Sequence, residues 1–200
     1  MTQPQLMLTY FGFPARGELT RLTLIFGGID FEDHRIDGAV LAELKPSLPL
    51  AQIPVLEVNG VTYAQSMALA RYSGRLTGLY PSDPLTALTV DMLVDSTLEV
   101  LDGFIDINWR TAEDTKADKK QAFATGAMPK IFAMLEKQAA SPWFLGEHPS
   151  IADLFIFDVY TNDLKGMFSE FDIAVYPTVQ AIIAKVAANP NVAAYLAKHK

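Results

Sequence analysis

The first eighty residues alternate between the two-residue period of half-buried strands and the wider apolar spacing of amphipathic helices. Gly27 and Gly28 follow an apolar helical run and predict that this helix stops there. The pair Asn59-Gly60 predicts a tight hairpin, because both residues tolerate positive φ. The expected elements are, in order, a strand at 5–11, a helix at 16–28, a strand at 29–36, a short helical piece at 40–49, strands at 53–58 and 61–65, and a helix at 66–78.

The pattern changes after the proline-bearing connector at 78–84, because every later segment has helical spacing. Ser150 and Asp153 match a capping box, and we expect them to start a helix rather than to do chemistry. The later helices are predicted at 85–110, 118–139, 150–165, 176–188 and 190–198. The order β-α-β-α-β-β-α before the connector resembles a thioredoxin-like domain. The expected fold is therefore α/β plus all-α, with a thioredoxin-like domain at 1–80 and an all-helical domain at 84–200.

Composition narrows the class of protein. Half of the 200 residues are hydrophobic and 20% are charged, which suits packed cores and argues against disorder. The net charge of −7 argues against general nucleic-acid binding. The absence of cysteine excludes disulfides, thiolate metal sites and a cysteine nucleophile. No apolar run approaches the roughly 20 residues of a membrane span, and no signal peptide is recognised at the N-terminus. We therefore expect a cytoplasmic protein without a membrane partner.

Most familiar catalytic and metal-binding motifs are missing from the sequence. The three histidines, His34, His148 and His199, lack metal-ligand spacing. No glycine-rich phosphate loop follows a strand, and no serine lies in a nucleophile elbow. We therefore expect no metal site.

A few positions in the first half carry candidate chemistry. Tyr10 is among the last residues of the first strand, and α/β folds tend to hold ligands beyond that end, although packing is the alternative role. A cis bond before Pro54 would offer the backbone of Ile53 to an extended peptide, yet only about 5–6% of such bonds are cis. Gln65 and Ser66 start a helix, whose N–H groups favour a carboxylate, and ordinary capping by Ser66 is compatible with that role.

Seven segments give the chain a family resemblance over nearly its full length. They are LTYF, RGELTRL, FEDHRI, LKPSLPLAQIPVLEV, AQSMALARY and, more weakly, VDSTLE and PSIADL. With these segments the chain resembles a cytosolic glutathione transferase of the tyrosine type. It is most similar to the sigma class, which includes glutathione-dependent prostaglandin D synthases and the S-crystallins. The resemblance implies that glutathione is a co-substrate and that the protein is a homodimer.

The resemblance also implies where each part of glutathione binds. The γ-glutamyl carboxylate would lie at Gln65 and Ser66, and the cysteinyl backbone would pair with Ile53 beside a cis Pro54. The thiol would lie beside Tyr10. The implied catalytic residues are Tyr10 and Arg16. The implied glutathione-binding set, with Lys45 and Gln52 near the glycyl carboxylate, is Tyr10, Phe11, Arg16, Leu41, Lys45, Gln52, Ile53, Pro54, Gln65, Ser66 and Glu99.

The role expected of Tyr10 is to stabilise the thiolate of glutathione. A thiol with a pKa of about 8.5 is only a few per cent ionised at neutral pH. Lowering that pKa by about two units needs a preference for the anion of about 2.7 kcal/mol. One hydrogen bond to a charged group contributes about 1.5–3 kcal/mol, and a protonated tyrosine can donate it, with Arg16 as a second positive influence. Phenylalanine at position 10 should therefore slow the reaction about a hundredfold.

Acidic residues recur at helical spacing early in the second domain, at Asp91, Asp95, Glu99, Asp102 and Asp106. A solvated helix face is one interpretation. The resemblance instead implies that Glu99 reaches the γ-glutamyl ammonium of the partner subunit, and that Asp95 lies where some relatives hold an interfacial divalent cation. Leu98 occupies a neighbouring acidic position of that cation site, so metal binding is not expected here.

Two departures from the sigma-class pattern affect the expected site. Leu41 stands where a tryptophan commonly bonds the glycyl end of glutathione. Losing that bond would weaken glutathione binding by about 1.5–3 kcal/mol, or about ten- to a hundredfold. Pro14 and Ala15 replace the first two residues of an Arg-Gly-Arg turn, of which only Arg16 is kept.

The expected reaction is attack of the glutathione thiolate on electrophilic, mostly apolar substrates. The alternative is a non-catalytic, crystallin-like or ligand-carrying member, which Leu41 favours, whereas Tyr10 and Arg16 favour the enzyme. An isomerase of the prostaglandin D synthase type ranks lower, because Asp106 would place a charge against an apolar lipid. The candidate electrophile-site residues are Phe13, Phe104, Asp106 and Arg110.

Overall fold

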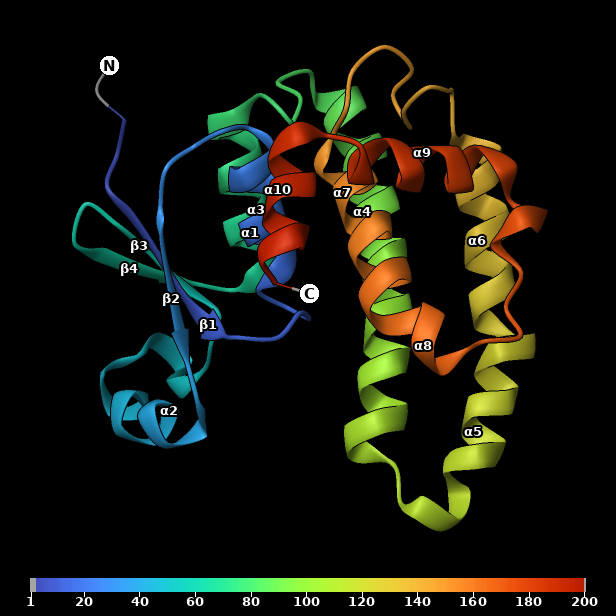
Figure 1. Ribbon diagram of the computed structural model, residues 1–200, viewed down its shortest axis with the longest axis horizontal. Coiled ribbons are helices and arrows are strands. Elements are labelled where there is room, and N and C mark those ends of the chain that lie inside the picture. The colour runs from blue at the N-terminus through green and yellow to red at the C-terminus, as the bar shows by residue number, and fades with distance from the viewer. Residues whose placement is uncertain (1–2, 200) are drawn as a thin grey trace. The chain divides into compact units, whose positions relative to one another are not determined.

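The computed structural model describes residues 3–199, which divide into two compact units (Figure 1). The first unit runs through Tyr80 and includes the end of the chain from Asn189 on, whereas the second spans Pro81–Ala188. The last helix, α10 (Pro190–Lys198), contacts α1 (Glu18–Phe26). The sequence pattern placed this helix in the second domain, since periodicity does not reveal which core a helix covers.

A four-stranded mixed sheet forms the centre of the first unit. β1 pairs in parallel with β2 and antiparallel with β3, and β3 pairs antiparallel with β4, so that the strand order is β2-β1-β3-β4. This arrangement confirms the predicted β-α-β-α-β-β-α order. The strands are β1 (Leu6–Phe11), β2 (Glu32–Ile36), β3 (Val55–Val58) and β4 (Val61–Ala64). The other helices of the unit are α2 (Gly38–Leu44) and α3 (Ser66–Thr77), with 3₁₀ turns at Lys45–Ser47 and Pro49–Ala51.

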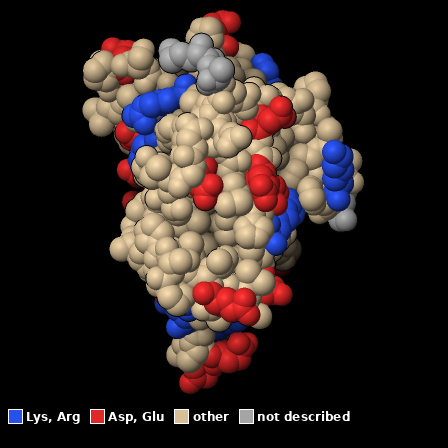
Figure 2. All heavy atoms as spheres, turned by 90° about the vertical axis from the view of Figure 1, so that its left-hand side faces the viewer, with Lys and Arg blue, Asp and Glu red and all other residues tan. Residues whose placement is uncertain are grey.

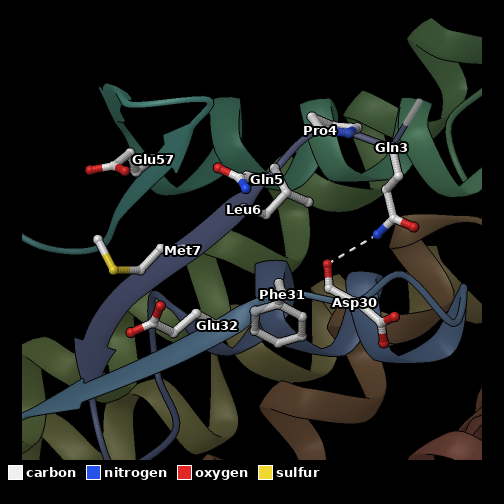
Figure 3. Close-up of a pocket in the computed structure, with 9 residues that line it drawn as sticks. All are labelled: Gln3, Pro4, Gln5, Leu6, Met7, Asp30, Phe31, Glu32 and Glu57. Carbon is white, nitrogen blue, oxygen red and sulfur yellow. Dashed lines mark hydrogen bonds between the residues drawn. The ribbon is translucent and has the colours of Figure 1, made fainter. Parts of the chain in front are cut away.

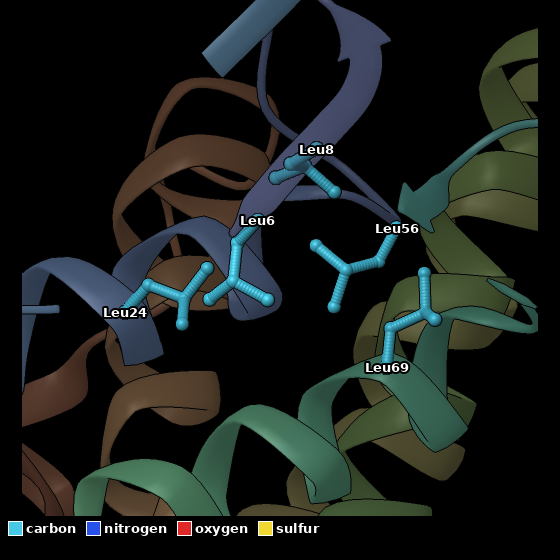
Figure 4. Close-up of a cluster of buried hydrophobic side chains, with 5 residues drawn as sticks. All are labelled: Leu6, Leu8, Leu24, Leu56 and Leu69. Carbon is cyan, nitrogen blue, oxygen red and sulfur yellow. The ribbon is translucent and has the colours of Figure 1, made fainter. Parts of the chain in front are cut away.

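One face of this sheet is closed by a leucine cluster, which Figure 4 shows. Leu6 and Leu8 of β1 and Leu56 of β3 pack against Leu24 of α1 and Leu69 of α3. None of the five residues is more than 5% exposed. Helices α1 and α3 therefore cover the face on which the even-numbered residues of β1 lie.

The turns predicted from glycine and asparagine are confirmed. Helix α1 ends at Phe26, and Gly28 takes a φ of +66°. Asn59 and Gly60 connect β3 to β4 with φ values of +50° and +82°, as a tight hairpin of this kind requires.

The second unit is all-helical and packs around α7, whose residues are all buried. Ser150 and Asp153 form the predicted capping box at the start of α7. The segment predicted at 118–139 is two helices, which meet at Gly126. The helices are α4 (Pro84–Ile105), α5 (Glu113–Thr125), α6 (Ala127–Gln138), α7 (Ile151–Asp158), α8 (Lys165–Met167) and α9 (Pro177–Ala187), with π turns at Asp106–Arg110 and Val159–Leu164 and a 3₁₀ turn at Ile173–Val175.

Charged side chains of both signs are dispersed over the face drawn in Figure 2, and uncharged residues cover most of it. Among residues 3–199, no helix is both long and apolar enough to cross a membrane.

Candidate functional site

The sheet register brings separate sequence segments to one end of the sheet. Tyr10 of β1 lies opposite Arg35 of β2, while Val55 of β3 pairs with both Thr9 and Ala64. One step beyond Val55 is Pro54, and one step beyond Ala64 is Gln65. These two residues therefore continue the row of the sheet to which Tyr10 belongs, although they are 44 and 55 positions away in the chain.

Tyr10 is held by packing and is 5% exposed. Its ring lies 5.5 Å from that of Phe11 and 6.3 Å from that of Phe13, while Phe11 and Phe13 stack at 4.9 Å. Phe13 is 49% exposed. The aromatic residues thus form a cluster at the end of β1 that extends from the buried Tyr10 to the surface.

Gly17 makes room for the ring of Tyr10. A Cβ atom at position 17 would lie 2.9 Å from the Cβ of Tyr10 and closer still to its Cγ and Cδ1. Because the backbone of Gly17 is in an ordinary helical conformation, with a φ of −88°, steric fit and not flexibility requires glycine here. This role of Gly17 was not predicted from the sequence, where its only signal is a glycine at a helix start directly after Arg16.

The altered turn before α1 has a strained backbone. Ala15 takes a φ of +141°, which is unfavourable for a residue with a side chain, and it is 5% exposed. Its carbonyl oxygen accepts a hydrogen bond from the N–H of Glu18 at 2.9 Å. Ala15 occupies the position where the family pattern has glycine, and glycine would adopt this conformation without strain. Arg16, which is half-buried, follows directly before the N-cap residue of α1, Gly17.

The Ile53–Pro54 peptide bond is cis. The base rate for such bonds argued against this conformation, whereas the family resemblance implied it, and the resemblance is confirmed on this point. Pro54 is buried, Ile53 is half-buried and Gln52 is exposed.

The start of α3 differs from the predicted cap by one residue. Gln65, not Ser66, is the N-cap residue, and no side chain caps the helix there. Gln65 takes a φ of +78°, which is rare for a residue other than glycine, asparagine or aspartate. Residues with such a strained backbone persist only where the surrounding structure holds them in place. They are frequent at binding sites. The first N–H groups of α3 lie beside this residue and have no partners within the helix.

The residues expected near the glycyl end lie on and after α2. Leu41 is half-buried on the helix, and Lys45 and Gln52 are exposed in the turns that follow. The side chain of Leu41 offers no hydrogen-bond donor, as the sequence already indicated.

The candidate electrophile-site residues of the second unit gather at the end of α4. Phe104 lies edge to face with Trp109 at 5.5 Å, and Trp109 is 62% exposed. Asp106 and Arg110 belong to the π turn that follows, and Asp106 forms an ion pair with Lys119. Neither Trp109 nor Lys119 was predicted from the sequence, because the fold of the π turn and of α5 brings them to these residues.

The acidic residues of α4 form no metal-binding group. Asp95 and Glu99 are exposed, and Asp91 and Asp102 are half-buried. Within the part of the chain that the structure describes, no three histidine, cysteine or carboxylate side chains lie close enough to hold a metal ion.

A cavity of about 680 Å³ lies at the opposite end of the sheet, where β1 begins (Figure 3). Asp30, Glu32 and Glu57 contribute carboxylates to its lining, and the side chain of Gln3 donates to the carbonyl oxygen of Asp30 at 3.1 Å. This cavity contains none of the predicted site residues, and we assign it no role.

Known proteins match both units of the chain. The family of glutathione S-transferase N-terminal domains matches residues 6–75, and that of glutathione S-transferase C-terminal domains matches residues 99–199. The solved structure of rat hPGDS complexed with a quinoline aligns with a TM-score of 0.87 at 31% identity, and the alignment covers 98% of this chain and 97% of that one.

Curated relatives align over nearly the full length. Hematopoietic prostaglandin D synthase of Gallus gallus is 34% identical, with 98% of this chain and 96% of the relative covered. Glutathione S-transferase 2 of Manduca sexta is 31% identical, with 96% of each chain covered. S-crystallin SL11 of Nototodarus sloanii is 26% identical, with 98% and 97% covered. The two domain matches and the full-length relatives show that this chain belongs to the glutathione S-transferase family.

Proposed function

We propose that this family member conjugates glutathione to electrophiles, and that the hydroxyl of Tyr10 stabilises the glutathione thiolate. The register of the sheet carries the proposal, because it aligns Tyr10 with Pro54 and Gln65 at one end. A tripeptide bound along this end would meet the backbone of Ile53, the start of α3 and the tyrosine together.

The proposed binding residues divide according to the parts of glutathione. Gln65 and Ser66 take the γ-glutamyl carboxylate at the N-terminus of α3, and Ile53 pairs with the cysteinyl backbone. Arg16 adds positive charge near the thiol. Phe11, Pro54, Leu41, Lys45 and Gln52 complete the site on the first unit, and Glu99 of a partner subunit is proposed to reach the γ-glutamyl ammonium.

The decisive change is Tyr10→Phe, which keeps the ring and removes the hydroxyl. We expect kcat for conjugation of glutathione to a chlorinated nitrobenzene to fall about a hundredfold at saturating glutathione, and the pKa of the bound thiol to rise by about two units. The thiolate is measured by its ultraviolet absorbance as a function of pH.

Tyr176→Phe is the matched control for this experiment. Tyr176 lies in the second unit, is 8% exposed and donates to the carbonyl oxygen of Pro129 at 3.3 Å. It should leave the thiol pKa unchanged. An unshifted thiol pKa in Tyr10→Phe would refute the tyrosine mechanism. Glutathione binding without turnover in the unmodified protein would support the carrier or crystallin-like alternative instead.

Prostaglandin isomerisation is a second candidate, and the structure adds one observation in its favour. The charge of Asp106, which argued against an apolar lipid, is offset by Lys119. The relatives named prostaglandin D synthase make the same reaction worth measuring. Formation of prostaglandin D from its precursor, with and without glutathione, tests this candidate.

We also propose that the protein is a homodimer. Val61 and Tyr63 of β4 are just over half exposed, at 53% and 52%. On α4, Leu85, Leu88 and Met92 are 72%, 64% and 41% exposed, at a spacing that puts them on one helix face. Exposed apolar groups of this kind favour association. Leu88→Asp should convert a dimer to a monomer in sedimentation analysis, and a monomeric unmodified protein would contradict the proposal.

We propose that the protein is cytoplasmic, because its sequence resembles the cytosolic branch of the family. Fractionation of cells that express the protein tests this location.

A further inference from the structure

Two arginines hold the loop after Tyr10 by its backbone. Nη2 of Arg21 donates to the carbonyl oxygen of Phe11 at 3.3 Å, and Nη1 of Arg35 donates to that of Gly12 at 3.3 Å. Arg21 is fully buried, and Arg35 lies opposite Tyr10 in the register of β1 and β2. The two guanidinium groups therefore restrain successive carbonyl groups at the point where the chain leaves the sheet.

Two carboxylates align these arginines. Asp33 accepts bonds from Nε of Arg21 at 2.9 and 3.0 Å and from Nε of Arg35 at 2.8 Å. Glu18, which is 2% exposed, forms an ion pair with Arg21. Burial by itself would lower the pKa of Arg21, but the charges of Glu18 and Asp33 outweigh it and raise that pKa. The two positive and two negative charges compensate one another, which the buried Arg21 and Glu18 require most.

Tyr195 of α10 connects the two sides of this cluster. Its hydroxyl donates to Oε1 of Glu18 at 2.8 Å and accepts a bond from Nη2 of Arg35 at 3.2 Å. His199, one turn later, lies 3.3 Å from Nη1 of Arg35. Burial and the charge of Glu18 raise the pKa of Tyr195 well above its usual value, so that its hydroxyl remains a donor. Through one hydroxyl, the last helix is bonded both to the first turn of α1 and to β2.

We propose that Tyr195 is a positioning residue for the transferase reaction, because it fixes through Glu18 and Arg35 the stretch of chain between Tyr10 and Arg16. This inference rests on the proposed function, which assigns thiol activation to those two residues. In this proposal Tyr195 acts through its bonds to Glu18 and Arg35 and not on the substrate directly. Its hydroxyl holds Arg35 on the carbonyl of Gly12 and Glu18 at the start of α1, so both ends of the loop keep their spacing. Stabilisation of an anion depends on such fixed donors, and a displacement of about 1 Å can cost about a hundredfold in rate.

The variant Tyr195→Phe tests the proposal, because it keeps the ring and removes only the hydroxyl. We expect the pKa of the bound thiol to rise by about one unit. At a pH below both thiol pKa values, kcat should then fall about tenfold, because the thiolate fraction falls in the same proportion. The KM for glutathione should change by less than about threefold. The pH profile of kcat and the thiolate absorbance measure these effects.

A purely structural role of Tyr195 predicts a different result. The melting temperature would fall, while the thiol pKa of the folded protein would stay that of the unmodified enzyme, and this outcome overturns the inference. Tyr176→Phe is again the control, because it removes a hydroxyl that donates to a carbonyl oxygen in the second unit. It should not change the thiol pKa.

The double variant Tyr10→Phe/Tyr195→Phe separates this inference from the proposed function. If Tyr195 acts by positioning Tyr10 and Arg16, it shifts the thiol pKa less in the Tyr10→Phe background than in the unmodified enzyme, because only the contribution of Arg16 is left to lose. Additive shifts would overturn the inference, as would an unshifted thiol in Tyr195→Phe beside a shifted one in Tyr10→Phe. If Tyr10→Phe itself shifts nothing, the proposed function and the inference both fail.

Discussion

The two units hold their candidate functional residues in different ways. In the first unit, the backbone pairing of β1 with β2 and β3 fixes the position of Tyr10 in the sheet, and Gly17 packs against its ring. In the second unit, Phe104 and Trp109 meet at the end of a helix, where Trp109 is 62% exposed. A sheet register tolerates little change, whereas exposed side chains at a helix end can be exchanged without loss of the fold. In the proposed function, the first arrangement would bind the one constant co-substrate, and the second would bind electrophiles that vary.

Ion pairs show the same contrast. The side chains of Arg21 and Glu18 are 1% and 3% exposed, whereas those of Lys119 and Asp106 are 46% and 38% exposed. Removing one partner of a buried pair leaves an uncompensated charge and costs about 3–5 kcal/mol, whereas an exposed pair contributes about 0–1 kcal/mol. Removing one charge of the Arg21–Glu18 pair should therefore destabilise the protein far more than removing one charge of the Lys119–Asp106 pair.

Gly17→Ala should have the largest effect, because the added methyl group overlaps the inner atoms of the Tyr10 ring, which cannot swing away as a flexible chain end does. We expect kcat to fall about a hundredfold, as for loss of the tyrosine hydroxyl, and stability to fall by about 1–3 kcal/mol. Enzyme assays and thermal unfolding measure the two effects.

Gly166→Ala is the matched control for this change, since a Cβ at position 166 of α8 meets nothing within 4 Å. Activity within about twofold of the unmodified enzyme in Gly17→Ala would show that Tyr10 is not confined by Gly17.

Leu41→Trp should have an intermediate effect, and in the favourable direction. A tryptophan at this half-buried position of α2 supplies the side-chain N–H donor that leucine lacks. We expect the Kd for glutathione to fall about tenfold in calorimetric titration, as one bond to a carboxylate implies. Leu41→Phe adds an aromatic ring without a donor and should give much less. Equal gains from both variants would assign the effect to ring packing and refute the proposed glycyl contact.

Lys119→Gln should have the smallest effect, and it should appear only on the electrophile. Without Lys119 the charge of Asp106 is uncompensated, so the KM for an apolar electrophile should rise about two- to threefold. The Kd for glutathione should stay constant. Lys116→Gln, which breaks the exposed pair with Glu113 in the same helix, is the control. If Lys119→Gln changed the affinity for glutathione and left the KM for the electrophile unchanged, the proposal that this part of the second unit binds the electrophile would be refuted.

The order of elements, the hairpin at Asn59 and the glycine stop of α1 could all be predicted from the sequence, because turn chemistry and apolar periodicity are local. Family motifs added the cis Pro54, against its low base rate. The capping preference of Ser66 placed the start of α3 one residue too late, since the N-cap is Gln65, whose positive φ no local pattern indicated.

The sequence did not reveal which distant residues lie together, because that depends on the folded arrangement of the chain. The alignment of Tyr10, Pro54 and Gln65 needs strand register, and register is a property of paired strands that no single segment encodes. Likewise, Gly17 gains its role from the ring that lies against it, and Tyr195 gains its role from Glu18 and Arg35, which lie more than 150 positions earlier in the chain. Local patterns specify elements, whereas long-range contacts assemble the site, because hydrogen bonds and packing act through space and not along the sequence.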